Sequence, residues 1–332
     1  MESAARSMAQ GNYGDIDFVR VFIANKKKLR ENAHTRYGPY ESENNPINYL
    51  ATLRNLLALN PDIVICSLWR SCFVALLFQL LRPKTRLVSF LHTPHAVHIP
   101  DYVFNSLVGI FAAQVWADSE TTLRGRVPRS RQQKSHVISF VLDHRASVAT
   151  ADLQPAFVYW GRLHPRKGLS RAIRLFAQIR RLVPAASYTI VGPDAGDGTA
   201  LRKLCRELGI ADAVRFAGPM DYSQIAAEAS SHSFYLQTSE TEGMAMSVVE
   251  AMQLGLVPIV THAGEIAAYC TDDENSLIVD DDEQALSRVI ALLANPVQYD
   301  RLRSNARNHW HDRPLYRDSV LTACRAILAR MK

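Results

Sequence analysis

The sequence lacks an apolar run long enough to cross a lipid bilayer. Its longest uncharged apolar runs are Ser71–Leu81 and Phe104–Ala117, and both are shorter than the roughly 20 residues that a membrane-spanning helix needs. We therefore interpret them as buried helices. The chain also has no low-complexity segment and no internal repeat. With 48% hydrophobic residues, it has the composition of a globular protein.

Cysteine is scarce, and its spacing fits neither a metal site nor a disulfide framework. The chain has five cysteines, an odd number, and none forms a Cys-x-x-Cys pair. No apolar secretory segment opens the sequence. We therefore expect reduced thiols, no zinc site and a cytoplasmic location.

Acidic residues are too few in the first 150 residues to balance the basic ones. This part carries 18 Lys and Arg against 11 Asp and Glu, whereas the remainder carries 20 against 21. The basic clusters Lys26–Arg30 and Arg124–Lys134 lack interleaved aromatic residues that would stack on bases, so we do not expect nucleic acid as a partner. Peripheral contact with an anionic membrane face, an anionic acceptor and a plain solvated surface all remain open.

What the sequence does contain is an alternation of short apolar runs and helical patterns. At 332 residues the length suits two domains, and the weakly patterned residues 145–155 form a linker between two such series. The alternation predicts an α/β fold with parallel, doubly wound sheets. The predicted strands are Ile16–Ala24, Asp62–Cys66, Arg86–Leu91, Val115–Ala117, Val137–Ile138, Phe157–Trp160, Tyr188–Val191, Val214–Ala217, Phe234–Leu236 and Val257–Val260.

The helical patterns lie between these strands and after them. The predicted helices are Tyr49–Leu59, Cys72–Leu81, Phe104–Phe111, Ser170–Leu182, Thr199–Leu208, Ser223–Ala229, a helix that starts at Met244, Glu283–Leu293, Asp300–Trp310 and Tyr316–Arg330.

A strand, a polar loop and a helix meet at the stretch Thr238–Pro258. Glu242 ends the loop, and Gly243 permits close approach of the backbone. The amides of Met244, Ala245 and Met246 would point out of the helix start, where an anionic group is stabilised.

Glu250 lies about 6 Å further along the same helix and could accept hydrogen bonds from a diol such as a ribose. The alternative is that Glu242 only complements the helix dipole and that Glu250 is a solvated helix residue. The neighbours of Glu250 favour the functional interpretation, because Val249 and Ala251 are apolar and an idle charge is unusual in such a setting.

The segment from Glu242 to Val260, EGMAMSVVEAMQLGLVPIV, resembles the signature of retaining, nucleotide-sugar-dependent glycosyltransferases of the GT-B fold, family 4. The resemblance implies two Rossmann-like domains, with Glu242 against the donor sugar and Glu250 on the ribose. It divides the chain into residues 1–144, the linker 145–155, a donor-binding domain over 156–315 and a last helix, 316–332, that crosses back to the first domain.

The loop Trp160–Gly168, WGRLHPRKG, carries two cations, Arg162 and Lys167, with Gly161 beside them. Cations placed in advance would stabilise the charge that gathers on a departing diphosphate. The resemblance assigns them that role and implies that no catalytic metal or other cofactor is needed; no Asp-x-Asp pair is placed to hold a metal beside a nucleotide sugar. The alternative is that both are surface charges in a loop that enters a helix.

Three further positions resemble donor-contacting loops of the family. Gly192 opens the glycine-rich loop GPDAGDG, Gly264 lies in the HAGE segment, and Met220 would flank the nucleobase. Each glycine could instead be an ordinary turn residue.

His92 closes a predicted strand, where a histidine in a cleft can bond a sugar hydroxyl, and the family has a donor-contacting histidine here. A packed or surface histidine is the alternative. His95 and His98 complete an H-x2-H-x2-H pattern, but Pro94 would prevent a helix from aligning the three on a metal.

The amino-terminal end departs from the family. Members open with a strand, a Gly-Gly loop and a helix, and neither that strand nor that loop occurs in this sequence. Met1-Glu2 resembles the residues that follow the two glycines, and Ala4–Gln10 resembles the helix. We hypothesise that the chain lacks its true amino terminus or descends from a shortened ancestor, so that the first sheet is one central strand short.

These observations predict a retaining glycosyltransferase that moves a sugar from a UDP-, GDP- or ADP-sugar to a hydroxyl of a glycan, polysaccharide or lipid-linked acceptor. The expected location is the cytoplasm or the inner membrane face. Two alternatives remain open: a non-catalytic protein that binds nucleotide sugars, and a nucleotide-sugar epimerase of the same architecture.

Overall fold

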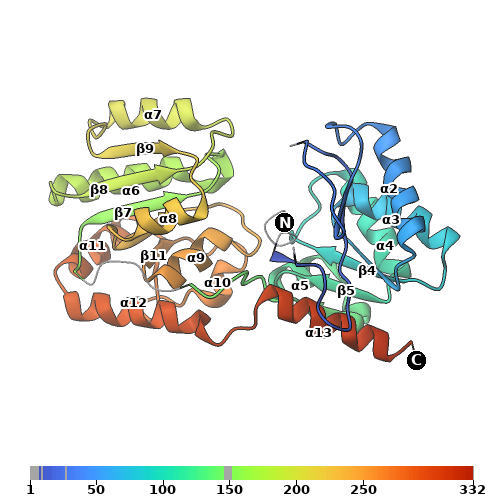
Figure 1. Cartoon of the computed structure of the whole chain (residues 1–332). Coiled ribbons are helices and arrows are strands. Elements are labelled where there is room, and N and C mark those ends of the chain that lie inside the picture. Colours follow the sequence, from blue (N-terminus) through green and yellow to red (C-terminus); the bar gives the residue numbers. More distant parts are fainter. Residues whose placement is uncertain (1–6, 9, 27, 146–151, 332) are drawn as a thin grey trace. The chain divides into compact units, whose positions relative to one another are not determined.

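The computed structural model describes residues 7–331 apart from residues 9, 27 and 146–151. The chain divides into two compact units, the first made of residues 1–143 and 314–332 and the second of residues 144–313. Each unit combines parallel strands with helices (Figure 1), so the predicted α/β fold class is confirmed. The residues Met1 and Glu2, on which the family comparison of the amino terminus depends, lie outside the described part.

The second unit contains a six-stranded parallel sheet in the order β12-β11-β10-β7-β8-β9. The strand order reverses between β7 and β10, and ligands of open α/β sheets bind at the carboxyl ends of the strands beside such a reversal. The strands are β7 Ala156–Trp160, β8 Ser187–Val191, β9 Val214–Gly218, β10 Phe234–Gln237, β11 Val257–Val260 and β12 Leu277–Ile278.

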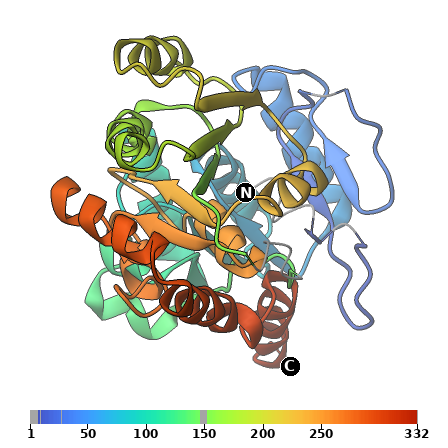
Figure 2. The ribbon, with the colours of Figure 1, turned by 90° about the vertical axis from the view of Figure 1, so that its left-hand side faces the viewer.

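Helices cover both faces of this sheet (Figure 2). The helix α6 packs against α7 and α11, and α9 packs against α8 and α12. Because both faces are covered, the strands are largely apolar, and Phe234, Tyr235 and Leu236 of β10 are fully buried. The helices are η2 Pro165–Lys167, α6 Leu169–Leu182, α7 Gly198–Glu207, α8 Tyr222–Ala229, α9 Met246–Leu254, α10 Ile266–Tyr269, α11 Asp282–Leu293 and α12 Pro296–His311.

The first unit contains a four-stranded parallel sheet in the order β3-β4-β5-β6 and a separate parallel pair, β1-β2. Its strands are β1 Arg20–Phe22, β2 Thr35–Tyr37, β3 Ile63–Cys66, β4 Arg86–Leu91, β5 Gln114–Ala117 and β6 Ser135–Val137. Its helices are α2 Pro46–Leu59, α3 Trp69–Leu81, α4 Ile99–Phe111, α5 Glu120–Arg126, η1 Arg129–Lys134 and α13 Tyr316–Ala329.

The prediction of a long strand over Ile16–Ala24 was wrong in extent. Only Arg20–Phe22 is a strand, because its partner Thr35–Tyr37 offers just three residues for pairing. That partner, together with α5 and η1, was not predicted.

The last helix of the chain returns to the first unit. The amide of Tyr316 donates to the carbonyl of Val141 at 2.7 Å, and Arg325 pairs with Asp15 at 2.8 Å. None of the described helices is both long and apolar enough to span a membrane.

The first residue of the predicted linker packs on the second unit. The Arg145 amide donates to Oε1 of Gln253 at 3.0 Å, and its guanidinium lies 3.2 Å above the ring of Tyr222. Residues 145–155 are predicted to link the two units; Arg145 packs on the second of them, and residues 146–151 lie outside the described part.

Candidate functional site

Two loops meet at the carboxyl ends of β7 and β10, where the strand order of the second sheet reverses. Gly168, which ends the loop after β7, has a φ of +64°, and a Cβ at this position would stand 1.8 Å from the carbonyl oxygen of Thr238. The hydroxyl of Thr238 donates to the Gly168 carbonyl at 2.7 Å. Only glycine allows this contact, so the two loops predicted to form the site are held against each other.

The contact between the loops places Lys167 beside Glu242. The ammonium Nζ lies 2.6 Å from Oε1 of Glu242, and the two side chains are 21% and 8% exposed. The same oxygen accepts hydrogen bonds from Nε2 of Gln237 at 2.8 Å and from the hydroxyl of Ser239 at 2.7 Å. These bonds compensate the burial of the carboxylate. All three bonds fall on Oε1, which leaves Oε2 to accept a bond from a ligand.

The helix beside this pair begins at Met246, so the prediction of a start at Met244 was wrong. Ala245 precedes the helix in the left-handed conformation, with a φ of +52°, which the periodicity of the sequence does not reveal. The Met244 carbonyl accepts a bond from the hydroxyl of Tyr269 at 2.9 Å. Alanine has no side chain that could cap the helix. The amide of Val248 donates to the Ala245 carbonyl at 2.9 Å, so the amides of Met246 and Ser247 are the ones in the first turn that could meet an anion.

Gly264 supports Glu242 from the neighbouring loop after β11. Its φ is +59°, and a Cβ here would stand 2.1 Å from the carbonyl oxygen of Glu242. The carbonyl of Gly243 accepts a bond from the amide of Glu265 at 3.0 Å. Gly264 thus lets the loops after β10 and β11 pack closely, and the Gly243 carbonyl adds a hydrogen bond between them.

Glu250 is held by a residue that the sequence reasoning missed. The indole Nε1 of Trp160, the last residue of β7, donates to Oε2 of Glu250 at 3.1 Å. Burial raises the pKa of Glu250, while the Trp160 hydrogen bond and the charge of Arg145 lower it. A tryptophan at the end of the strand that precedes the cationic loop was the signal that could have indicated this contact.

Gly161 and Gly192 bring the ends of β7 and β8 together. The amide of Gly161 donates to the Val191 carbonyl at 3.0 Å, and a Cβ on Gly192 would stand 1.8 Å from the Gly161 carbonyl oxygen. Both glycines therefore serve the packing of the two strand ends.

The glycine-rich loop that begins at Gly192 is closed by its own aspartate. Oδ1 of Asp194 accepts bonds from the amides of Gly196, Asp197 and Gly198 at 2.9, 3.2 and 3.0 Å. The bonds from Gly198 and Gly196 are the main causes that lower the pKa of Asp194. These amides are therefore occupied within the loop.

Two other predicted site residues, Arg162 and Met220, differ in how much of their surface is exposed. The Arg162 side chain is exposed, and no carboxylate partner is found for it among the residues described. Its carbonyl accepts a bond from the hydroxyl of Tyr159 at 3.0 Å. Burial raises the pKa of Tyr159, the charge of Glu242 raises it further and that of Arg162 lowers it, so both charges act on this ring. Met220 is half-buried between β9 and α8.

His92 belongs to the first unit, where it follows β4. Its Nδ1 lies 3.8 Å from Oδ2 of Asp118, and its ring lies 4.4 Å from that of Phe90. Burial lowers the pKa of His92, while Asp118 raises it, so the ring is neutral near pH 7. Ser119, next to Asp118 in the chain, caps α5 by accepting a hydrogen bond from the amide of Thr122 at 3.1 Å.

No group of three or more His, Cys, Asp or Glu side chains that could hold a metal ion occurs within the described residues. All five cysteines are free thiols.

Comparison with known sequences gives a family match. The sequence model described as "Glycosyl transferases group 1" matches residues 142–309, which include the loops and the helix described above.

Curated relatives carry the same kind of name. The chain is 27% identical over 180 residues to D-inositol 3-phosphate glycosyltransferase 2 of Catenulispora acidiphila, a match that covers 50% of this chain and 42% of that protein. It is 26% identical to GDP-mannose:cellobiosyl-diphosphopolyprenol alpha-mannosyltransferase of Xanthomonas oryzae, over 61% of this chain and 56% of that protein. The chain thus spans about half the length of these relatives.

Solved structures share the architecture. The sucrose-phosphate synthase of Thermosynechococcus elongatus superposes with a TM-score of 0.81 at 18% identity, covering 98% of this chain and 91% of that one. Anabaena HepE in complex with UDP superposes with a TM-score of 0.75 at 15% identity, covering 94% and 100%. At such identities the likeness shows the fold.

Proposed function

The chain belongs to the glycosyl transferases group 1 family, and on this premise we propose that it is a retaining glycosyltransferase of family 4 that uses a nucleotide diphosphate sugar. The observation that carries the proposal is the 2.6 Å pair between Lys167 and Glu242 next to the start of α9. A cation, a carboxylate and a helix amino terminus gather there, and these groups are suited to a sugar linked to a pyrophosphate.

The donor diphosphate would lie between the cationic loop and the helix start. An ammonium group has three N–H donors, so Lys167 can bond Glu242 and still donate to a phosphate oxygen. Arg162 supplies a second, exposed cation from the same loop. Both charges stabilise the diphosphate as the bond to the sugar breaks, and we infer that they make a catalytic metal unnecessary. Activity that persists in EDTA would support this part of the proposal.

The two glutamates would hold the two ends of the donor. Oε2 of Glu242 takes part in none of the three bonds to Oε1 and can accept a bond from a sugar hydroxyl. Glu250 uses Oε2 for Trp160, so its Oε1 remains to accept from the ribose hydroxyls. A bound diol favours the charged carboxylate, against the effect of burial.

The transfer itself needs no covalent bond to the protein. The acceptor hydroxyl attacks the anomeric carbon on the face that the diphosphate leaves. Its oxygen forms the new glycosidic bond, its proton passes to a phosphate oxygen, and the configuration of the sugar is retained.

For the acceptor we propose a lipid-linked sugar or a glycan at a membrane surface, which the protein reaches from the cytoplasm. The exposed face of α4 supports this, because Ile99, Val103 and Ile110, which lie on one side of the helix, are 78%, 40% and 53% exposed. Apolar side chains gathered on one helix face indicate an interaction surface. Arg126 pairs with Asp101 of α4 at 3.0 Å, which brings the basic segment that follows α5 close to this helix.

The test is a panel of donors. The purified chain is titrated calorimetrically with UDP-, GDP- and ADP-sugars, and the bound donor is then incubated with lipid-linked and soluble glycan acceptors. Transfer with retained anomeric configuration, read by NMR of the product, supports the proposal. Inversion would contradict the family 4 mechanism, and an epimerised donor in the absence of acceptor would identify an epimerase.

A second candidate function is nucleotide-sugar binding without transfer. It is favoured by the first unit, whose sheet is divided into a four-stranded part and a separate pair, while the described donor loops are continuous. Donor binding with neither transfer nor hydrolysis across the acceptor panel would select this candidate.

A further inference from the structure

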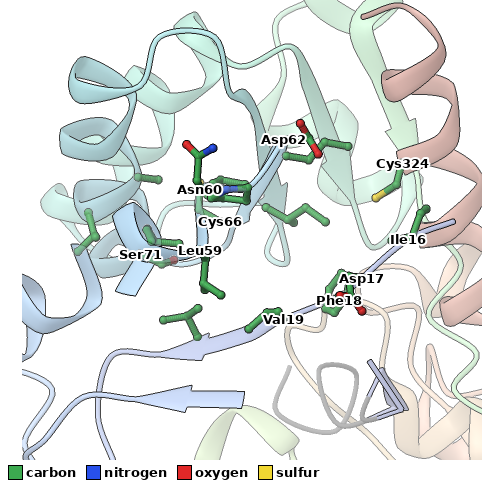
Figure 3. A pocket seen from close by; sticks show the side chains of 18 of the residues that line it. Ile16, Asp17, Phe18, Val19, Leu59, Asn60, Asp62, Cys66, Ser71 and Cys324 are labelled. Atoms are coloured by element: carbon green, nitrogen blue, oxygen red, sulfur yellow. The ribbon is translucent and has the colours of Figure 1, made fainter. Parts of the chain in front are cut away.

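The two units differ in what lies beside their strands. In the first unit, β3 borders a cavity of about 510 Å³ whose lining is mainly apolar (Figure 3). In the second unit, polar side chains at the carboxyl end of β10 are instead joined by hydrogen bonds. Gln237, the last residue of this strand, lies at their centre and is fully buried. A buried polar network whose members are all satisfied is rigid and specifies one arrangement.

All four hydrogen-bonding positions of the Gln237 amide are used. Its carbonyl oxygen accepts from the hydroxyl of Tyr235 at 2.6 Å and from the hydroxyl of Ser247 at 3.1 Å. Its nitrogen donates to the hydroxyl oxygen of Ser239 at 2.9 Å and to Oε1 of Glu242 at 2.8 Å. A primary amide has two N–H donors and two acceptor lone pairs, so the Gln237 side chain is fully satisfied by the protein.

These partners fix which way the amide faces. An ionised carboxylate accepts hydrogen bonds and cannot donate them, so the nitrogen of Gln237 faces Glu242 and the oxygen faces the two hydroxyls. The hydroxyl of Tyr235 is held in place in turn, because the tyrosine is fully buried and its ring centroid lies 4.7 Å from that of Trp160. Ser247 lies in the first turn of α9, so the same amide connects Glu242 to the helix start.

The network determines which oxygen of Glu242 is available to a ligand. Oε1 accepts from Lys167 at 2.6 Å as well as from Gln237 and Ser239, so moving the carboxylate out of this position would break three bonds. The Ser239 hydroxyl accepts from Gln237 and donates to Glu242, and hydrogen bonds in such a chain strengthen one another. Two of the three bonds to Oε1 thus depend on one amide.

We propose that Gln237 is a positioning residue for the transfer reaction, an inference that rests on the proposed function. It holds the carboxylate of Glu242 so that Oε2 meets the donor sugar in the geometry that the transition state needs. Because Gln237 is fully buried and its polar atoms all bond protein groups, it acts through Glu242 and does not contact the donor. Its loss should therefore slow the transfer step more than it weakens donor binding.

The experiment uses three substitutions in the full chain. Gln237→Met keeps the approximate volume of the side chain and removes its hydrogen bonds. Tyr235→Phe keeps the packing of the ring and removes one bond to Gln237. Tyr188→Phe is the matched control, because Tyr188 is also fully buried in this sheet and its hydroxyl donates to the carbonyl of Leu236 at 2.9 Å. Each tyrosine substitution is made alone and together with Gln237→Met. The readouts are kcat for transfer from UDP-, GDP- and ADP-sugars, calorimetric Kd for UDP, GDP and ADP, and Tm.

We expect Gln237→Met to lower kcat by about 100-fold, because a small displacement of a reacting group is enough for such a loss, and to change the Kd of the nucleoside diphosphate by less than about threefold. Tyr235→Phe should lower kcat by about fivefold in the parent chain. It should leave kcat unchanged in the Gln237→Met background, because its hydroxyl acts through the amide. Tyr188→Phe should lower Tm as much as Tyr235→Phe does but keep kcat within about twofold of the parent value.

Equal kcat in Gln237→Met and the parent chain, additive effects of Gln237→Met and Tyr235→Phe, or equal kcat in the two tyrosine variants would each overturn the positioning role and leave the proposed function standing. Should Gln237→Met fail to fold, the contrast between Tyr235→Phe and Tyr188→Phe in the parent chain decides. A parent chain that transfers sugar from none of the three donors would instead refute the proposed function, and this inference with it.

Discussion

The indole nitrogen of Trp160 donates a 3.1 Å hydrogen bond to Oε2 of Glu250, a residue 90 positions further along the chain. This bond connects the end of β7 to the middle of α9. It fixes one oxygen of the carboxylate and leaves the other free for a ligand. The proposed ribose contact therefore depends on a tryptophan at the end of a different element, β7.

Replacing Glu250 tests the ribose contact. We expect Glu250→Gln to weaken binding of the nucleoside diphosphate by roughly 10- to 100-fold, because hydrogen bonds to a charged group are worth about 1.5–3 kcal/mol. The amide keeps the shape of the side chain and can still accept from Trp160. Isothermal titration calorimetry measures the change.

Glu283→Gln is the matched control, since Glu283 is exposed on α11 of the same unit. Unchanged affinity in Glu250→Gln, or an equal loss in the control, would contradict the proposed contact.

The ion pair between Lys167 and Glu242 predicts that a second substitution can restore the stability lost on replacing Lys167 without restoring the activity. Lys167→Met leaves the carboxylate of Glu242, which is 8% exposed, without its cation, and we expect the free energy of unfolding to fall by about 3 kcal/mol. Adding Glu242→Gln should restore most of this stability, because no buried charge remains. The rate of transfer should stay at least about 100-fold lower in both variants, because the leaving diphosphate has lost its cation.

Urea denaturation and initial rates give the two quantities. Lys203→Met is the control, since Lys203 is 71% exposed and pairs with Glu207 at the surface. A double variant that regains activity together with stability would show that Lys167 has only a structural role.

Much of the site could be predicted from the sequence because its residues lie in two continuous stretches. Glu242, Gly243 and Glu250 share one stretch, Arg162 and Lys167 share the other, and parallel strands bring the loops that follow them to one sheet edge. The strands β7 to β11 of the second unit were also predicted within a few residues, since buried parallel strands are mostly continuous apolar runs, whereas the two-residue strand β12 was not predicted.

What could not be predicted depends on backbone conformation and on partners far apart in sequence. The left-handed Ala245 delays the start of α9, although alanine is the best helix former. The loop amides that could have met a phosphate instead bind Asp194, and no periodicity distinguishes these outcomes. The short strand β2 has too few residues to show an alternating pattern.

The pKa of Glu250 predicts how its replacement depends on pH. Burial raises this pKa above its ordinary value of 4.5, so the folded state holds the proton more tightly than the unfolded state. The group thus stabilises the fold fully below pH 4.5, and this contribution is lost as the pH rises through the raised pKa. We expect Glu250→Gln to gain stability relative to the unsubstituted chain between pH 5 and pH 8. Urea denaturation across this range measures the difference, and a difference that shrinks as pH rises would contradict the burial of the charge.

Alanine substitutions at two glycines with similar left-handed backbones distinguish the free-energy cost of backbone strain from the cost of a steric clash. Gly264 and Gly209 have φ values of +59° and +68°, but an added Cβ meets the Glu242 carbonyl oxygen at 2.1 Å in the first and nothing within 4 Å in the second. We expect Gly209→Ala to cost about 1–2 kcal/mol of unfolding free energy and to leave transfer unchanged. Gly264→Ala should cost more and should also slow transfer, because Glu242 must move. Thermal unfolding measures the stability of each variant, and initial rates measure its transfer activity. Equal activities in the two variants would argue against a role for Gly264 in holding the site.

The exposed face of α4 predicts binding to anionic membranes. Ile99 and Ile110 are 78% and 53% exposed, and replacing both with serine removes apolar area that would otherwise leave water at the lipid boundary. We expect co-sedimentation with vesicles of phosphatidylglycerol and phosphatidylcholine to weaken by about tenfold, in line with a loss of about 1.4 kcal/mol. Val297→Ser is the control, because Val297 is 81% exposed but lies on α12 of the second unit. High salt should weaken the binding further, since the basic residues of 124–134 act through charge. If the unsubstituted chain does not bind vesicles but forms a dimer that the double serine variant cannot form, then the face of α4 binds a second copy of the chain and the membrane assignment is wrong.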